Sequence, residues 1–344
     1  MDSVKTALVI GGGLAGLEAA IKIGQAGHKT ILVEKEAALG GNVAKLFSSF
    51  PRWENPVDLL EYKINKLKEC SLISVMTGTT VKFAQKRDKS YSVELLSTTG
   101  TKNKIEVDAV VIATGFELFD ASVYGEYGYG SFDNVMDSLQ FEAKLKEWSE
   151  NKENISPPKS VAFFKCVGSR DRSKGFPYCS KVCCMYTAKQ AGLVKDLFPD
   201  TRCFVFYMDY RAAGKEYEEF TRSVIEQKHV RYVRGRPSKV LPEDGRLLIR
   251  AEDTLMGVPI EITADMIVLA SAVVPSHGTK EMSKLFNAKI DQYGFIDHED
   301  FNPVKTGDRV FYAGACGFAV ENLGAMHQGA AAAAEVISLF NQVD

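Results

Sequence analysis

Residues 4–16, which read VKTALVIGGGLAG, constrain this chain more than any other stretch. Apolar β-forming residues lead directly into Gly11, Gly13 and Gly16, which fit the spacing G-x-G-x-x-G. In this pattern the first glycine allows a tight turn and the second lets a pyrophosphate approach the backbone. The third lets the following helix lie close to the strand. The stretch therefore predicts a strand, a phosphate-binding turn and a helix.

The residues around this turn strengthen the prediction. Leu14 and Ala15 open the helix, whose first N–H groups would face the phosphates. A second apolar strand at 30–33 ends in Glu34, an acid at the position that binds a ribose in dinucleotide-binding units. The alternative, a glycine-rich turn that binds nothing, does not account for strand, glycines, helix, strand and acid in this order.

The segment after Glu34 favours FAD over NAD. It reads KEAALGGN, and with the ATG that ends at Gly115 and the YAG that ends at Gly314 it resembles the flavoproteins with two dinucleotide domains, the family that includes thioredoxin reductase. The resemblance implies FAD contacts at Lys35, Gly41, Asn42, Lys45, Val81, Ala113, Thr114, Gly115, Gly314, Ala315, Asn322 and Leu323. Ala315 departs from the family, which usually has aspartate there. Lys45 is either near flavin N5 or a surface lysine.

Composition narrows the class of protein. The chain has 344 residues and a net charge of −2, without the basic blocks that nucleic-acid binding needs. No apolar run is long enough for a membrane span, and the N-terminus does not resemble a signal peptide. We therefore expect a cytoplasmic α/β protein.

Two Rossmann-like dinucleotide-binding-type domains are expected. The first comprises 1–117 and 295–344, and the second, comprising 118–294, is inserted into it. The strand at 161–164 should open a second phosphate loop, but no G-x-G-x-x-G follows. The second domain is therefore expected to be a degenerate NAD-type domain.

Hydrophobic patterns predict individual elements. We expect helices at 14–25, 56–68, 133–148 and 322–340, and an antiparallel meander formed by strands at 72–76, 79–83 and 91–96.

Four cysteines stand where the second phosphate loop would be. They are Cys166, Cys179, Cys183 and Cys184, and four thiolates are the ligand set of one 4Fe–4S cluster. Zinc, a redox-active dithiol and inert buried thiols are the alternatives. The adjacent Cys183 and Cys184 would need a turn or helix start to direct both sulfurs to one site. Positive charges that could offset an anionic cluster follow at Arg170, Arg172, Lys174 and Lys181.

The cysteine region resembles the A subunit of heterodisulfide reductase. The similarity rests on CVGSRD at 166–171, YCSKVCCMY at 178–186, MDYR at 208–211, GKEYEEF at 214–220 and VRGR at 233–236. It implies that the four cysteines bind a 4Fe–4S cluster, that FAD is the second cofactor, and that other subunits of a complex are partners.

The chain differs from the long A subunits of methanogens. It has no ferredoxin-type cysteine run, and no cysteine follows Ser49–Trp53 until Cys70. It is therefore more similar to the short A subunit of heterodisulfide-reductase-like complexes of sulfur-oxidising prokaryotes, for which flavin-based electron bifurcation is not expected. The flavoprotein of a quinone-interacting complex is a related alternative.

Three hypotheses for function follow. The first is an electron-transfer oxidoreductase subunit that holds FAD and an iron–sulfur cluster, exchanges electrons with a carrier such as NADH or a ferredoxin-like protein, and forms a homodimer. The second is a stand-alone NAD(P)H-dependent flavin disulfide reductase, which would need the missing phosphate loop. The third is a non-catalytic scaffold in which FAD stabilises the fold.

Overall fold

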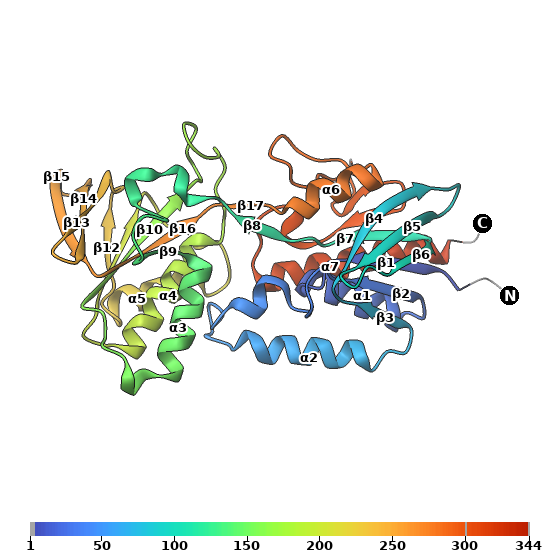
Figure 1. The fold of residues 1–344 in the computed structure, drawn as a ribbon, viewed down its shortest axis with the longest axis horizontal. Coiled ribbons are helices and arrows are strands. Elements are labelled where there is room, and N and C mark those ends of the chain that lie inside the picture. Colours follow the sequence, from blue (N-terminus) through green and yellow to red (C-terminus); the bar gives the residue numbers. More distant parts are fainter. Residues whose placement is uncertain (1–3, 300, 343–344) are drawn as a thin grey trace. The chain divides into compact units, whose positions relative to one another are not determined.

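The computed structural model describes residues 4–299 and 301–342, which form two compact units. Unit 1 consists of 1–44, 57–117 and 274–344, and unit 2 of 45–56 and 118–273. Figure 1 labels most of their helices and strands along the chain.

Unit 1 is built on a six-stranded sheet with the order β18-β19-β7-β1-β2-β3, parallel except that β18 runs antiparallel to β19. Its strands are β1 (Thr6–Ile10), β2 (Lys29–Val33), β3 (Ile73–Met76), β7 (Ala109–Ile112), β18 (Lys305–Gly307) and β19 (Val310–Tyr312). All side chains of β7 and β19 are buried, because both faces of a parallel sheet are covered.

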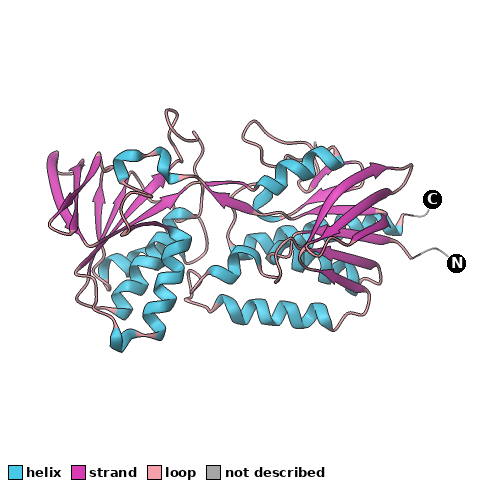
Figure 2. Cartoon of the chain, in the orientation of Figure 1, coloured by secondary structure: helices cyan, strands magenta, loops and turns pink. Residues whose placement is uncertain are grey.

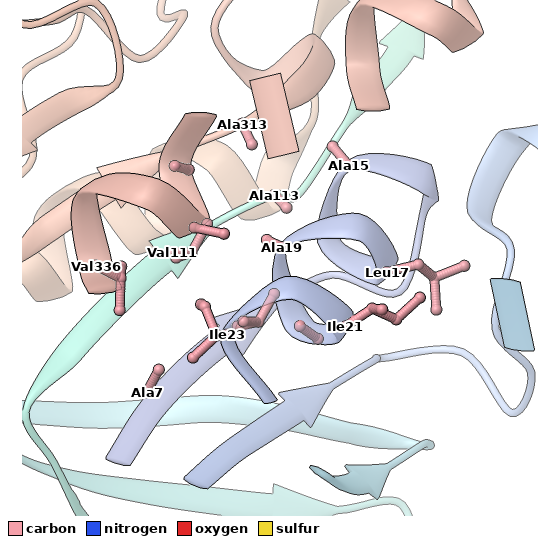
Figure 3. Close-up of a cluster of buried hydrophobic side chains, with 14 of the residues drawn as sticks. Ala7, Ala15, Leu17, Ala19, Ile21, Ile23, Val111, Ala113, Ala313 and Val336 are labelled. Atoms are coloured by element: carbon pink, nitrogen blue, oxygen red, sulfur yellow. The ribbon is translucent and has the colours of Figure 1, made fainter. Parts of the chain in front are cut away.

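Unit 1 contains four α-helices, of which α2 has its first residue in unit 2. They are α1 (Leu14–Gln25), α2 (Pro56–Lys68), α6 (His277–Phe286) and α7 (Asn322–Asn341). A Cβ at Gly329 of α7 would lie 2.3 Å from the carbonyl oxygen of Ala15, so α7 can approach α1 this closely only without a side chain there. Leu17, Ile23 and Val336 belong to the core that these helices share with the sheet (Figure 3).

A small antiparallel sheet completes unit 1. It consists of β4 (Thr79–Lys86), β5 (Tyr91–Ser97) and β6 (Lys102–Val107). The predicted meander is therefore wrong in one strand: β3 pairs in parallel with β2 of the main sheet, and β6 takes its place.

Unit 2 has a five-stranded parallel sheet with the order β12-β11-β10-β16-β9. Its strands are β9 (Val135–Asp137), β10 (Ser160–Val167), β11 (Arg202–Tyr207), β12 (Arg231–Arg234) and β16 (Met266–Ser271). Helices α3 (Ser138–Glu150), α4 (Cys183–Leu197) and α5 (Tyr217–Glu226) cover one face, where Phe141, Ala188 and Val224 contact the same core.

The other face of this sheet packs against a three-stranded antiparallel sheet (Figure 2). That sheet is formed by β13 (Lys239–Glu243), β14 (Arg246–Asp253) and β15 (Val258–Ala264). Two further strands, β8 (Phe116–Leu118) and β17 (Val273–Pro275), pair with each other. Short 3-10 helices are η1 (Gly41–Lys45), η2 (Ala121–Val123), η3 (Gly125–Tyr127), η4 (Lys152–Asn154) and η5 (Gly314–Cys316).

The unit boundaries differ from the expected domain boundaries at two places. Residues 274–294 lie in unit 1, because Phe286 of α6 packs on Tyr91 with ring centroids 5.4 Å apart. Residues 45–56 lie in unit 2, because the Phe47 amide donates to Glu142 Oε2 at 2.9 Å and Lys189 Nζ donates to the Ser48 carbonyl at 2.8 Å.

The helix predicted at 133–148 is also corrected. Val135–Asp137 forms β9, and α3 begins only at Ser138, where Asp137 caps it in a capping box with Gln140. The helices predicted at 14–25 and 56–68 are confirmed. Among the described residues, no helix is both long and apolar enough to cross a membrane.

Candidate functional site

The glycine turn of unit 1 connects β1 to α1 through residues 11–13 only. Gly11 has a φ of +112°, and a Cβ there would lie 2.2 Å from the carbonyl oxygen of Ala113. A Cβ at Gly16 would lie 1.9 Å from the carbonyl oxygen of Gly11. Packing within the unit therefore requires glycine at both positions.

Gly13 differs from these two glycines. A Cβ at Gly13 would meet no atom within 4 Å, so nothing in the described protein fills the space beside it. Gly13 is also the N-cap of α1, and no side chain caps the helix there. The N–H groups of the first turn thus have no side-chain cap and point in the direction that an anion at a helix N-terminus uses.

Glu34 fixes the shape of this turn. Its side chain is buried at the end of β2, with Oε2 accepting a hydrogen bond from the Gly12 amide at 2.6 Å and Oε1 accepting one from the Glu36 amide at 2.9 Å. Lys35 is exposed and pairs with Glu36 at 3.9 Å. The acid predicted beside the glycines is therefore in contact with them.

Other predicted residues of unit 1 gather near the same end of the sheet. Gly41 lies over the turn, since a Cβ there would be 3.3 Å from Gly13 Cα. Gly314 packs next to α1, where a Cβ would be 2.7 Å from that of Ala15, and its amide donates to Gln328 Oε1 at 2.9 Å. Gln328 is a contact that the sequence did not suggest.

The remaining predicted residues have other surroundings. Asn42 donates to the Phe116 carbonyl at 3.0 Å, and Thr114 bonds to Thr279 through their hydroxyls at 2.7 Å. Val81 is buried in the core on the opposite face of the sheet from α1. The rest are placed as follows: Ala113 and Gly115 follow β7, Ala315 is buried in η5, Lys45 is exposed at the end of η1, and Asn322 and the exposed Leu323 begin α7.

In unit 2 the connection from β10 to α4 spans 168–182 and contains Cys179, while Cys166 lies at the end of β10 and Cys183 and Cys184 begin α4. Cys166 is the second-last residue of β10 and has a φ of +61°, and Arg170, in the connection that follows, has a φ of +56°. The loop folds back on itself, because the Phe176 amide donates to the Gly168 carbonyl at 2.8 Å. The cysteine loop, residues 166–184, thus replaces the short glycine turn found in unit 1.

Three of the four thiols are in contact. Hydrogen bonding with the Cys183 thiol lowers the pKa of Cys166 to about 7 and that of Cys184 to about 5, and the same contacts raise the pKa of Cys183. Cys183 and Cys184 are both buried, and α4 begins at Cys183, which provides the helix start that their adjacency requires. Cys179 Sγ accepts a hydrogen bond from the Lys181 amide at 3.4 Å.

Positive charge and N–H groups surround these sulfurs. Arg170 lies close enough to Cys166 and Cys179 for both sulfurs to help raise its pKa, after its hydrogen bond to Asp209. The backbone N–H of Arg211 and the ammonium of Lys165 both hydrogen-bond to the Cys184 sulfur. Lys174 instead pairs with Glu126 at 2.8 Å, and Arg172 is exposed. Of the predicted cations, Arg170 therefore faces the sulfurs, whereas Lys174 does not.

Asp171 holds the cysteine loop in place. Its carboxylate accepts hydrogen bonds from Ser173, from the Tyr124 hydroxyl at 2.6 Å and from Arg236 at 2.9 Å. These bonds, first those from Ser173, keep the pKa of Asp171 far below its usual range. The carboxylate therefore acts as an acceptor that ties the loop to Tyr124 and Arg236.

Lys165, Asp209 and Arg211 were missed in the sequence. Lys165 resembles an ordinary strand residue, and the 208–211 segment is distant in sequence from the cysteines. The parallel pairing of β10 with β11 brings them together, because it puts the carboxyl ends of both strands at one edge. The only signal was the MDYR motif at 208–211, which had no assigned role.

All seven cysteines are free thiols in this structure. Across the described ranges 4–299 and 301–342, no three His, Cys, Asp or Glu side chains are arranged to hold a single metal ion. A four-iron cluster is a different case, because each thiolate binds its own iron atom. The donor set fits such a group: four thiols, two cations beside them, a backbone N–H directed at one sulfur, and a helix N-terminus.

Comparison with known proteins shows which proteins the chain resembles. Residues 5–162 match the family model of the pyridine nucleotide-disulphide oxidoreductases. The chain is 30% identical to the iron–sulfur A subunit of the CoB–CoM heterodisulfide reductase of Methanocaldococcus jannaschii, an alignment that covers 88% of the chain and 59% of that relative. It is 31% identical to one of the corresponding A subunits of Methanopyrus kandleri, over 97% of the chain and 64% of that relative.

Solved structures show the same fold. The thioredoxin reductase of T. acidophilum superposes with a TM-score of 0.67 at 15% identity, covering 96% of this chain and 97% of its own. A NAD-dependent persulfide reductase from A. fulgidus gives a TM-score of 0.63 at 20% identity, over 96% of this chain and 59% of its own. The predicted fold class, the thioredoxin-reductase-like α/β architecture, is therefore confirmed.

The chain spans about 60% of the length of the curated relatives it matches. Within that span the similarity includes both units, since 97% of the chain aligns with the relative from Methanopyrus kandleri. The chain is thus similar in sequence to the A subunits of heterodisulfide reductases over both units, and its residues 5–162 match the pyridine nucleotide-disulphide oxidoreductase model.

Proposed function

We propose that the chain is an electron-transfer subunit that holds FAD in unit 1 and a 4Fe–4S cluster in unit 2, and that it works in a cytoplasmic heterodisulfide-reductase-like complex. The main observation behind the proposal is that the cysteine loop, residues 166–184, takes the place that a second phosphate loop would have between strand and helix. Several relatives are named as iron–sulfur subunits of heterodisulfide reductases, which supports both the cluster and partner subunits.

FAD is supported by the glycine turn of unit 1. Gly13 leaves space for a pyrophosphate beside uncapped N–H groups, and Glu34 is held at the adjoining strand end. Gly41 lies close to this turn, since a Cβ there would be 3.3 Å from Gly13 Cα. When bound, FAD would supply two-electron chemistry that can be passed on as single electrons. The residues of the chain bind and orient the cofactor and set its surroundings.

We propose the remaining FAD contacts because several of these residues follow the carboxyl ends of strands in unit 1. Ala113, Thr114 and Gly115 follow β7, and Gly314 and Ala315 follow β19, at the carboxyl ends of strands where ligands of α/β sheets bind. Because Ala315 has no carboxylate, the amides of η5 and of the first turn of α7 at Asn322 and Leu323 would have to replace that contact. Lys35, Asn42, Lys45 and Val81 complete the proposed set.

The cluster is supported by the chemistry around the cysteines. Cys166, Cys179, Cys183 and Cys184 supply four thiolates, and Lys165 and Arg170 supply positive charge. Among the alternatives, a redox-active dithiol would need only two of these cysteines and would leave the other two without a role. The segment 168–182 also removes the short phosphate loop that a dedicated NAD(P)H site needs.

The identity of the complex follows from the resemblance to short A subunits. We propose a role in sulfur-compound oxidation, with partner subunits that carry the thiol or disulfide site and with a second copy of the chain as homodimer partner. The electron carrier would be NADH or a ferredoxin-like protein. The flavoprotein of a quinone-interacting complex is the related alternative.

Anaerobic reduction tests this proposal against a stand-alone NAD(P)H-dependent disulfide reductase. The purified chain is mixed with dithionite, NADH or NADPH, and flavin absorbance and the EPR signal of a reduced cluster are followed. We expect dithionite to bleach the flavin and to produce a cluster signal. Fast and complete reduction by NADPH without any EPR signal of a cluster would support the disulfide reductase instead.

A further inference from the structure

Unit 2 contains two buried lysines with different partners. Lys189 is 1% exposed, and its ammonium pairs with Glu142 Oε1 at 2.7 Å. Lys165 is 5% exposed, but in the described part of the chain no carboxylate pairs with it. A buried ammonium is costly unless a negative group or several acceptors compensate it, so the partner of Lys165 needs an explanation.

The surroundings of the Lys165 ammonium identify that partner. Nζ donates to the Asp209 carbonyl at 3.2 Å and lies 5.4 Å and 6.0 Å from the ring centroids of Tyr207 and Tyr232. It also hydrogen-bonds to the Cys184 sulfur. In this set the sulfur of Cys184 is the group that ionises most readily, because a thiol is more acidic than the phenols of Tyr207 and Tyr232.

Asp209 holds the other cation of the site. Its carboxylate accepts from Arg170 at 2.6 Å, while its carbonyl accepts from Lys165. The next residues bring the Arg211 N–H to the Cys184 sulfur. The segment 209–211 therefore fixes two cations and one N–H donor around the cysteines, which gives the MDYR motif a physical role.

A further polar group is directed at the same place. The Tyr232 hydroxyl is buried and makes no hydrogen bond to the described residues, and its pKa is raised first by burial and then by the nearby Cys184 sulfur. Such a hydroxyl can donate to a thiolate, free or bound to a cluster, which is a stronger acceptor than a neutral thiol. This observation agrees with that from Lys165.

We propose that the buried ammonium of Lys165 raises the reduction potential of the cluster held by the four cysteines, with Arg170 as a weaker second contributor. This inference rests on the proposed function. Reduction adds one electron to the cluster and makes it one unit more negative, so a positive charge in a dry environment stabilises the reduced state more than the oxidised one. Lys165 thereby determines which donors, the flavin of the same chain among them, can reduce the cluster.

The test is the midpoint potential of the cluster in the purified full chain, measured by redox titration with EPR detection. Lys165→Met keeps the length and burial of the side chain and removes its charge. We expect the equilibrium constant for one-electron reduction to fall about tenfold or more, a shift of about 59 mV to lower potential. Lys165→Arg restores a charge and should restore most of the potential.

Lys174→Met is the matched control, because it removes a lysine of the same loop whose ammonium pairs with Glu126 and not with a sulfur. Its potential should equal that of the wild type. An unchanged potential in Lys165→Met at wild-type iron content would overturn the inference while leaving the proposed function intact. Wild-type chain without iron, by contrast, would overturn the proposed function itself.

Loss of the cluster from Lys165→Met does not end the test. Arg170→Gln then removes the second cation, which lies at the more exposed side of the site next to Cys166 and Cys179. We expect a smaller shift in the same direction. A potential equal to that of the wild type and of Lys174→Met would contradict the role of buried charge.

Discussion

The β1–α1 turn of unit 1 and the β10–α4 connection of unit 2 occupy equivalent places, each joining a central parallel strand to the helix that follows it. The first is residues 11–13 and consists of glycines, whereas the second is 168–182, contains Cys179 and is flanked by Cys166 and Cys183. The same strand–helix frame thus presents N–H groups beside open space in one unit and sulfurs among cations in the other. The frame fixes the place of a site, and the loop decides its chemistry.

The largest expected effect separates the two loops by their cofactors. Cys183→Ala removes the thiol that contacts both Cys166 and Cys184, and we expect iron per chain to fall from about four to nearly none with FAD retained. Cys203→Ala, at a buried core cysteine of β11 in the same unit, is the control and should keep its iron. Wild-type iron in Cys183→Ala would contradict the assignment of that ligand.

The reciprocal change is in the glycine turn. Gly13→Ala adds a methyl group where the protein has no atom within 4 Å, so the fold should tolerate the change. FAD affinity should fall at least tenfold, which corresponds to about 1.4 kcal/mol of binding free energy. FAD per chain and iron per chain are measured together, and iron should be unchanged. Gly125→Ala in unit 2, also in open space, is the control. Normal flavin binding by Gly13→Ala would show that the pyrophosphate does not lie there.

Gly16→Ala tests a glycine that the packing of unit 1 requires, in contrast to Gly13. Its methyl group would lie 1.9 Å from the Gly11 carbonyl oxygen, so we expect loss of unit 1 stability itself and not only of flavin. Thermal unfolding of the chain in excess FAD distinguishes the two cases, because added FAD should compensate for Gly13→Ala but not for Gly16→Ala.

A moderate effect is expected at the paired buried lysine. Lys189→Met leaves Glu142 buried without its cation, which should cost about 3–5 kcal/mol of unfolding free energy. It should also release Ser48 and raise hydrogen exchange around 47–50. Lys144→Met breaks an exposed pair with Glu147 and should cost less than about 1 kcal/mol. Equal effects of the two variants would contradict the burial argument.

The smallest effect concerns how the cysteine loop responds to pH. Hydrogen bonds from Ser173, Tyr124 and Arg236 depress the pKa of Asp171 in the folded protein. The contribution of Asp171 to the free energy of unfolding is therefore fully present above its unfolded pKa of about 3.9, and it is lost as the pH falls through the lower, folded pKa. The stability advantage over Asp171→Asn should therefore shrink from about pH 5 downward. Urea unfolding in a Cys183→Ala background measures it without a contribution from iron.

Asp88→Asn, at an exposed carboxylate of unit 1, serves as the control for this experiment and should show little difference at any pH. A constant advantage of Asp171 from pH 7 to pH 3 would mean that the carboxylate does not hold the loop through its charge.

Local patterns allowed much of unit 1 to be predicted. Helix α1 and the contact of Glu34 with the glycine turn depend on neighbouring residues in a βαβ unit, and both are present. The strand 73–76 was assigned to the wrong sheet, because a short apolar run does not reveal its pairing partner. Strand β6 was missed, since most of its side chains are exposed and charged or polar.

In unit 2 the cysteines could be predicted, but their surroundings could not. The spacing of the four thiols is visible in the sequence, whereas Lys165, Asp209 and Arg211 come together only through the pairing of β10 with β11. The same holds for 45–56, whose place in unit 2 depends on buried contacts with Glu142 and Lys189 across a long separation in sequence. Long-range contacts of this kind leave no periodic signal.

The most direct test of the central claim is the content of iron and acid-labile sulfide per FAD in chain purified without oxygen. The account predicts about four irons and four sulfides per FAD, because the cysteine loop provides one ligand for each iron. FAD without iron, even after anaerobic reconstitution with iron and sulfide, would contradict it and would mean that the four cysteines serve as redox thiols or as core residues.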